Sequence, residues 1–159
     1  LKFVPVLPIK LVRNLKGEAL MAFSKRGIDA YRNVNVSSAV PYADSVQLIQ
    51  MLFDGLMSSL ADAEGHIARK DIKEKTESIG RATKILIGLQ GALDFEKGGE
   101  IAVNLSDLYD YCVRRLLKAS IRNDILIVQE VKGLVTEIAE AWSTLPGLLA
   151  ENTNVPLAS

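Results

Sequence analysis

The chain has 159 residues, of which 48% are hydrophobic and 24% charged, with equal numbers of acidic and basic side chains. This length suits one domain with its own core, and the zero net charge argues against a nucleic-acid-binding protein. The one cysteine, Cys112, excludes a disulfide within the chain and fits a reducing compartment. No apolar run approaches the roughly 18 residues of a membrane span, so we expect no membrane insertion.

Residues 1–20 differ in composition from the sequence that follows. They hold two prolines in the first eight residues, are mildly basic and show no sustained helical period. Pro5, Pro8 and Lys10 interrupt the compact apolar stretch that a signal peptide needs. We expect residues 1–20 to be an upstream or non-native extension outside the fold, with Met21 as an ordinary start. The alternative is an added peptide that docks on the body of the protein.

From residue 44 onward, apolar residues recur at three- and four-residue steps, which is the pattern of amphipathic helices. Asp44 with Gln47 has the spacing of a capping box, and so has Asp71 with Glu74, so helices are predicted to start at both places. The inward positions of these two helices are Val46, Ile49, Phe53, Leu56, Leu60, Ala63 and Ile67, then Ile72, Ile79, Ala82, Leu86, Leu89 and Leu93.

Two further helices are predicted after the pair of glycines at residues 98–99. Their inward positions are Ile101, Leu105, Leu108, Cys112 and Leu116, then Val128, Val131, Val135, Ile138 and Trp142. Asn123 or Asp124 is expected to cap the last helix. The pattern predicts an all-α, antiparallel four-helix bundle over residues 44–150. An extended N-terminal segment, residues 21–43, precedes it, and a flexible tail, residues 151–159, follows.

The stretch Glu-Lys-Gly-Gly-Glu at residues 96–100 raises the question of a ligand-binding loop. A phosphate loop needs a strand leading into it and a pattern such as GxxxxGK[ST], and the stretch has neither. Glycine after a helix allows the left-handed backbone that closes the last carbonyls. The stretch is therefore predicted to be a corner between two helices, with Glu100 in the first turn of the next.

No group of residues indicates catalysis, a cofactor or a metal. The single histidine, His66, cannot make a histidine-rich metal site, and the Glu-x-x-His pairs of di-iron bundles are absent. Cys112 lies on an apolar stripe and is expected to be a buried packing thiol. His66 leaves open a histidine phosphotransfer bundle, although an exposed histidine near a helix end is the preferred interpretation.

The predicted helices carry more apolar residues than the core stripes use. The surplus residues are Ile87 and Phe95 on the second helix and Ile125 and Leu126 on the fourth. They suit a groove for an amphipathic partner, the seam of a homodimer, or scattered surface positions. A further alternative is that the N-terminal segment folds back over this surface, with Ile28 and Tyr31 as plugs.

Five stretches follow one another between Met21 and Leu145: "GIDAYRNVNV", "QLIQMLFDG", "LDFEKGGEIAVNLSDLYDYCVRRLL", "RND" and "IAEAW". Together they closely resemble the FliS family, the flagellin-specific export chaperones of bacterial flagella. The chain departs from the family where the first long helix starts, with Asp44-Ser45-Val46 in place of the usual Ser-Pro-His. Because Asp44 with Gln47 can cap instead of the proline, we expect this helix to survive with a slightly shifted start.

The resemblance implies a cytoplasmic chaperone that binds the disordered C-terminal region of flagellin and prevents its premature polymerisation. It also implies delivery of flagellin to the flagellar type III export gate, without catalysis. Flagellin would wrap around the bundle and lay apolar side chains into surface grooves, which the N-terminal segment would partly cover. With the family's NL..LY signature, part of which must be core, the expected flagellin-binding residues are Ile28, Tyr31, Ile87, Phe95, Asn104, Leu105, Leu108, Tyr109, Ile125 and Leu126.

Overall fold

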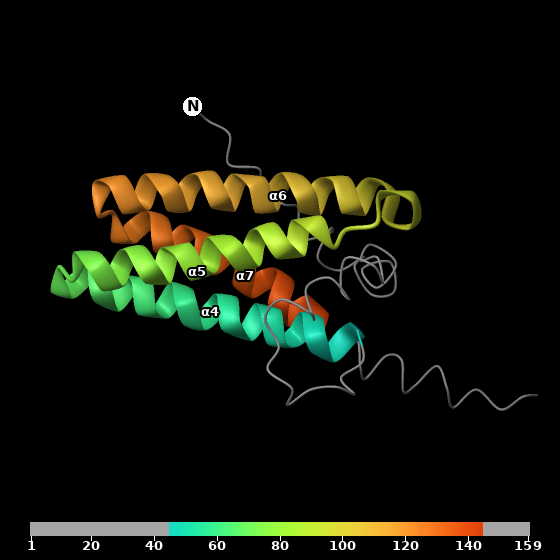
Figure 1. The fold of residues 1–159 in the computed structure, drawn as a ribbon. Helices are drawn as coiled ribbons and strands as arrows, with labels where there is room; N and C mark the ends of the chain where they lie inside the picture. Colours follow the sequence, from blue (N-terminus) through green and yellow to red (C-terminus); the bar gives the residue numbers. More distant parts are fainter. Residues whose placement is uncertain (1–44, 145–159) are drawn as a thin grey trace, which may run out of the picture.

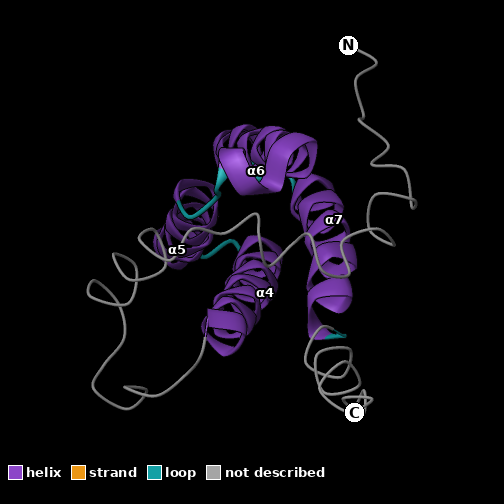
Figure 2. Cartoon of the chain, turned by 90° about the vertical axis from the view of Figure 1, so that its right-hand side faces the viewer, coloured by secondary structure: helices purple, strands orange, loops and turns teal. Residues whose placement is uncertain are grey.

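The computed structural model describes residues 45–144, which form four helices joined by short corners (Figure 1). In chain order the helices are α4 (Ser45–Arg69), α5 (Ile72–Gly91), α6 (Phe95–Arg122) and α7 (Ile125–Ser143). Each helix packs against two others, in the ring α4, α5, α6, α7, and successive helices run in opposite directions (Figures 1 and 2). The described residues contain no strand, so the predicted all-α four-helix bundle is confirmed.

Several predictions fall on residues that the structure does not describe. They concern the extension at 1–20, the segment at 21–43, the cap at Asp44 and the tail at 151–159.

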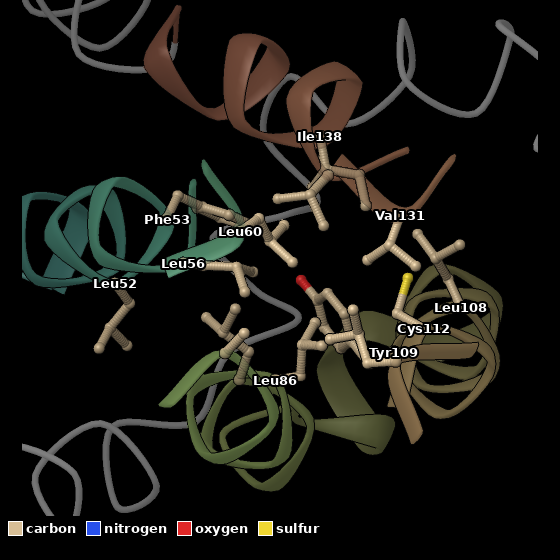
Figure 3. Close-up of a cluster of buried hydrophobic side chains, with 14 of the residues drawn as sticks. Leu52, Phe53, Leu56, Leu60, Leu86, Leu108, Tyr109, Cys112, Val131 and Ile138 are labelled. Carbon is tan, nitrogen blue, oxygen red and sulfur yellow. The ribbon is translucent and has the colours of Figure 1, made fainter. Parts of the chain in front are cut away.

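The core runs the length of the bundle and follows the helical periodicity of the sequence. Every predicted inward position with a described side chain is buried, except that Ile67 and Ile101 are half-buried and Ile72 is exposed. Ile72 is exposed because it is the first residue of α5, where the helix has only begun to pack. Phe53 of α4 meets Trp142 of α7 with ring centroids 6.4 Å apart, and Figure 3 shows Tyr109 pointing into the middle of this core.

The corners are made by short polar side chains, not all of them the predicted ones. The Asp124 carboxylate accepts a hydrogen bond from the Leu126 amide at 3.0 Å, which confirms the predicted cap of α7. Asp71 precedes α5 but makes no capping hydrogen bond, so its predicted capping box is wrong. Its carboxylate instead accepts a hydrogen bond from the Arg69 guanidinium at 3.1 Å and does not bind the first amides of α5.

The double glycine breaks the helix at Gly99, as predicted, but as a kink between the short first turn of α6 and the rest of that helix, while the corner with α5 comes earlier, at residues 92–94. The helix already begins at Phe95, because the Asp94 carboxylate accepts from the amides of Glu96 and Lys97 at 3.0 Å each. Gly99 then has φ 51° and ψ −130°, a backbone conformation that side chains with a Cβ rarely adopt. The first turn of α6 is therefore tilted away from the axis of the rest of the helix.

A buried lysine connects the start of α5 with the end of α6. Lys75 is only 4% exposed, and its ammonium group donates to the Ser120 carbonyl at 2.9 Å and to the Asn123 side-chain oxygen at 2.6 Å. Asn123 has φ 52° and ends α6 in the left-handed conformation. A cation at this place suits the partial negative charge of the last carbonyls of a helix. Lys75 therefore holds α5 against the C-terminal end of α6.

Replacing Lys75 by methionine is expected to lower the free energy of unfolding by about 2 kcal/mol, since buried acceptors would lose a charged donor. Urea unfolding followed by circular dichroism measures the change. Lys73→Met is the matched control, because Lys73 lies on the same helix and is exposed. Equal urea midpoints for the two variants would show that the Lys75 contacts do not stabilise the bundle.

The Tyr109 hydroxyl is the one buried side-chain polar atom within residues 45–144 that has no hydrogen-bond partner. Because an unpaired buried hydroxyl is unfavourable, Tyr109→Phe is expected to raise the free energy of unfolding by about 1 kcal/mol. Tyr111→Phe is the comparison: the Tyr111 hydroxyl donates to Glu130 of α7, so its removal should destabilise. A Tyr109→Phe protein less stable than Tyr111→Phe in urea would contradict this account.

Candidate functional site, an exposed apolar face on α5 and α6

Among the described residues we find no group of side chains arranged as a metal site or as a reactive thiol site. Among them, no three His, Cys, Asp or Glu side chains lie together in a way that could hold a metal ion. Cys112 is buried, and burial raises the pKa of its thiol to about 12, so it is uncharged at neutral pH. This confirms the packing thiol expected from the sequence. None of the helices within residues 45–144 is both long and apolar enough to span a membrane.

His66 belongs to a polar cluster where α4 ends. Its Nδ1 atom lies 3.0 Å from a guanidinium nitrogen of Arg69 and 3.6 Å from a carboxylate oxygen of Asp71. An approaching phosphoryl group would meet the negative charge of Asp71 beside this nitrogen. His66 lies in the last turn of α4, as predicted, but its side chain is half-buried and not exposed, and the arrangement does not favour a phosphotransfer site.

Two sets of polar contacts fix how α5 and α6 lie against each other. Near one end, the Gln90 amide donates to the Ser106 carbonyl at 3.2 Å and to the Ser106 hydroxyl at 3.1 Å. Near the other end, Lys75 reaches Ser120 and Asn123. The residue numbers rise along α5 while they fall along α6, so the two helices are antiparallel. The contacts also show which residues of each helix lie at the seam between α5 and α6.

Apolar side chains line the outer edge of this seam. On α5, Ile87 and Ile72 lie one helical turn before Gln90 and Lys75, and on α6 Leu117 lies one turn before Ser120. Residues three or four apart share a side of a helix, so these side chains lie along the seam. Ile121 lies one turn beyond Leu117 on α6 and is also exposed.

We call Ile72, Ile87, Leu117 and Ile121 the α5–α6 face. Their exposed fractions are 55%, 54%, 62% and 74%, although large aliphatic side chains usually favour the interior. Within the described residues, eight large hydrophobic side chains are exposed: Met51, Ile72, Ile87, Phe95, Val103, Leu117, Ile121 and Leu126. Six of the eight belong to α5 or α6, so the exposed apolar surface gathers on one side of the bundle.

The structure places the site residues expected from the sequence in several different environments. Ile87 lies on the α5–α6 face, and Phe95 is exposed on the tilted first turn of α6. Leu126 is exposed and Ile125 half-buried, but both begin α7 and lie off this face. Asn104 is half-buried on α6. Ile28 and Tyr31 lie outside the described residues.

Leu105, Leu108 and Tyr109 are core residues. This corrects the expectation that they bind flagellin at the surface. None of the three is more than 2% exposed, because their positions share the inward stripe of α6 with Cys112 and Leu116. Figure 3 shows Leu108 and Tyr109 directed toward side chains of the other helices. They can shape the bundle that presents the site, but they do not form its surface.

The sequence reasoning missed three of the four residues of the α5–α6 face. Leu117 and Ile121 lie outside the inward stripe of α6, so the comparison with the core stripe that identifies Ile87 as a surplus residue would identify them too. Ile72 was assigned to the core because it continues the inward period of α5. Its exposure depends on where the helix starts, which periodicity alone does not define.

Comparisons with known proteins agree on the family of the chain. The family described as flagellar protein FliS matches residues 27–147. The chain is 49% identical over 124 residues to the flagellar secretion chaperone FliS of Salmonella typhimurium (strain LT2), an overlap of 77% of this chain and 92% of that protein. It is 41% identical over 121 residues to the Escherichia coli (strain K12) FliS, covering 76% and 89% of the two chains.

A third relative, the flagellar secretion chaperone FliSB of Pseudomonas aeruginosa, is 38% identical over 120 residues, covering 76% of this chain and 95% of its own. The matched region includes all four helices and the α5–α6 face. These similarities confirm the resemblance found in the sequence. The chain belongs to the FliS family of flagellar proteins.

Proposed function

We propose that this protein is a flagellar secretion chaperone that binds the disordered C-terminal region of flagellin in the cytoplasm. Binding would prevent premature polymerisation of flagellin and help deliver it to the flagellar type III export apparatus. Membership of the FliS family and the names of the relatives support this function. The observation that carries it is the α5–α6 face, an exposed apolar surface on an otherwise well-packed bundle.

The α5–α6 face has the dimensions of a docking site for an amphipathic segment. Ile72 and Ile87 are fifteen positions apart on α5, which is about 22 Å along the helix axis. A flagellin helix of four turns would span this distance and could place apolar side chains at three- and four-residue steps along the seam. The seam also has polar groups at Gln90 and Ser106, which would orient such a segment.

Apolar burial would supply the free energy of this binding. A flagellin segment that buries about 1,000 Å² of apolar surface would gain roughly 25 kcal/mol before any cost. Much of this is offset by the ordering of a disordered chain, which leaves an expected Kd in the micromolar range or below. No catalysis, nucleotide or cofactor enters this mechanism, since binding and release alone protect flagellin until export.

Replacing one residue of the α5–α6 face by a charged one should weaken flagellin binding. For Leu117→Asp we expect the Kd for a peptide from the C-terminal region of the same bacterium's flagellin to rise at least tenfold, about 1.4 kcal/mol. Isothermal titration of the full chain measures it, and wild-type binding should show a negative heat-capacity change. Circular dichroism checks that the variant remains folded.

Met51→Asp is the matched control, because Met51 is also apolar and exposed but lies on α4, and it is not among the flagellin-binding residues expected from the sequence. Its Kd is expected to stay within about twofold of the wild-type value. Equal weakening by both substitutions would mean that the α5–α6 face is not the binding surface. Absence of saturable binding to the wild-type chain would contradict the proposed function itself.

A further inference from the structure

The described bundle carries opposite charges at its two ends. The α4–α5 corner and the α6–α7 corner lie together at one end, on the left of Figure 1. Residues 69–75 and 118–124 form this end and carry six basic and three acidic side chains, a net charge of +3. Residues 45–54, 90–100 and 137–144 form the other end and carry one basic and six acidic side chains, a net charge of −5. An anionic surface would therefore attract the first end and repel the second.

Four cations at the positive end have no hydrogen bond or ion pair of their side chains within residues 45–144. All four are exposed: Lys70, Lys73, Lys118 and Arg122. The partial negative charge at the C-terminal ends of α4 and α6 accounts for Lys70 and Arg122, because it favours cations there. Lys73 lies in the first turn of α5, where the same effect favours anions. The needs of the helices therefore do not explain all of this positive charge.

The acidic side chains at this end do not neutralise the four cations. Asp71 forms an ion pair with Arg69, and the Asp124 carboxylate caps α7. Glu74 lies in the first turn of α5, where a carboxylate suits the helix dipole. Two of the three acidic groups are thus already bound within the chain, which leaves the four cations open to an anionic partner.

Two large aliphatic side chains stand beside these cations. Ile121 and Leu126 are 74% and 70% exposed, more than any other large hydrophobic residue within the described chain. Ile121 directly precedes Arg122 on α6, and Leu126 lies just after the α6–α7 corner. Because Leu126 lies off the α5–α6 face, a flagellin segment bound there would leave it uncovered. We call these six residues the basic end: Lys70, Lys73, Lys118, Ile121, Arg122 and Leu126.

The composition of the basic end fits the surface of an anionic bilayer. Lysine and arginine side chains are attracted to anionic headgroups, while exposed aliphatic side chains reach between them. A single-stranded nucleic acid would also meet the cations, but its bases stack on aromatic side chains, and residues 66–75 and 118–126 contain none. An acidic protein segment would leave Ile121 and Leu126 without an apolar contact. An anionic bilayer uses both kinds of side chain.

We propose that the basic end docks on the surface of an anionic phospholipid bilayer, with the bundle standing on this end. The docking is peripheral, since no helix within residues 45–144 could span the bilayer. Repulsion of the acidic end sets the orientation. Along the 28 residues of α6, the acidic end would stand about 40 Å from the surface. Four cations and two aliphatic side chains make a small anchor, so the binding is reversible.

Flotation of the full chain with lipid vesicles tests the proposal. Vesicles of phosphatidylcholine alone are compared with vesicles that contain about 30% phosphatidylglycerol, at about 0.1 M salt. We expect the partition coefficient to be at least about tenfold higher on the anionic vesicles. Raising the salt concentration to about 0.5 M should lower it at least about tenfold, because salt screens exposed charges.

The double substitution Lys118→Glu with Arg122→Glu locates the binding surface. Because it replaces two cations of the basic end by anions, the partition coefficient on anionic vesicles should fall at least about tenfold. The matched control is Lys84→Glu with Lys97→Glu, which makes the same change of net charge at exposed lysines outside the basic end. Its partition coefficient should stay within about threefold of the wild-type value. Circular dichroism checks that both variants are folded.

Leu126→Ser tests the aliphatic part of the anchor separately. The partition coefficient on anionic vesicles should fall about threefold or more, because an apolar side chain is lost from the headgroup region. Its salt dependence should stay that of the wild type, since no charge changes. Met51→Ser is the control, because Met51 is exposed on α4 at the acidic end. Equal binding by these two variants would remove Leu126 from the anchor and contradict the proposed basic end.

Three further results would overturn the proposal. One is equal binding to neutral and anionic vesicles, or no binding to either. Another is an equal effect of the two double substitutions. Residues 1–20 also carry basic side chains and are the same in every variant, so binding through them would give this result. The third is binding to polyglutamate without binding to vesicles, which would assign the basic end to an acidic protein. None of these measurements uses flagellin, so they leave the proposed function to its own test.

Discussion

The contact between α5 and α6 is the constraint on which the exposed apolar face depends. The buried Lys75 ammonium binds the end of α6, and Gln90 binds Ser106 about four turns away, so these contacts fix how the two helices lie against each other. Ile87 and Leu117 share one seam only in this register. A shift by one residue would turn each of them by roughly 100° about its helix.

A second constraint is that the core is already filled without the exposed residues. Phe53, Trp142 and the aliphatic side chains of all four helices occupy the interior, and Tyr109 takes up its centre. Leu117 and Ile121 therefore add little to the stability of the isolated bundle, while they increase its apolar surface in water. Residues of this kind contribute when a partner covers them, which links the packing of the bundle to its proposed role in flagellin secretion.

The sequence predicted the helices well because burial repeats every three to four residues from Ile49 to Trp142. It placed the third helix start wrongly, since Asp94 competes with the double glycine as a start signal and periodicity does not decide between them. It also could not separate core from surface within the NL..LY signature, where Leu105 and Tyr109 proved to be buried. Which exposed residues gather on one face depends on contacts between helices, such as that of Lys75 with Asn123, which no local pattern contains.

Methyl NMR of the protein with labelled isoleucine and leucine side chains tests the central claim most directly, because it reports on each candidate residue separately. Titration with the C-terminal region of flagellin is predicted to shift the methyl signals of Ile72, Ile87, Leu117 and Ile121. The signals of the buried Leu56 of α4 and of the half-buried Leu134 of α7 should change little. Shifts confined to Leu126 and other residues off α5 and α6, with the four signals unchanged, would contradict the account.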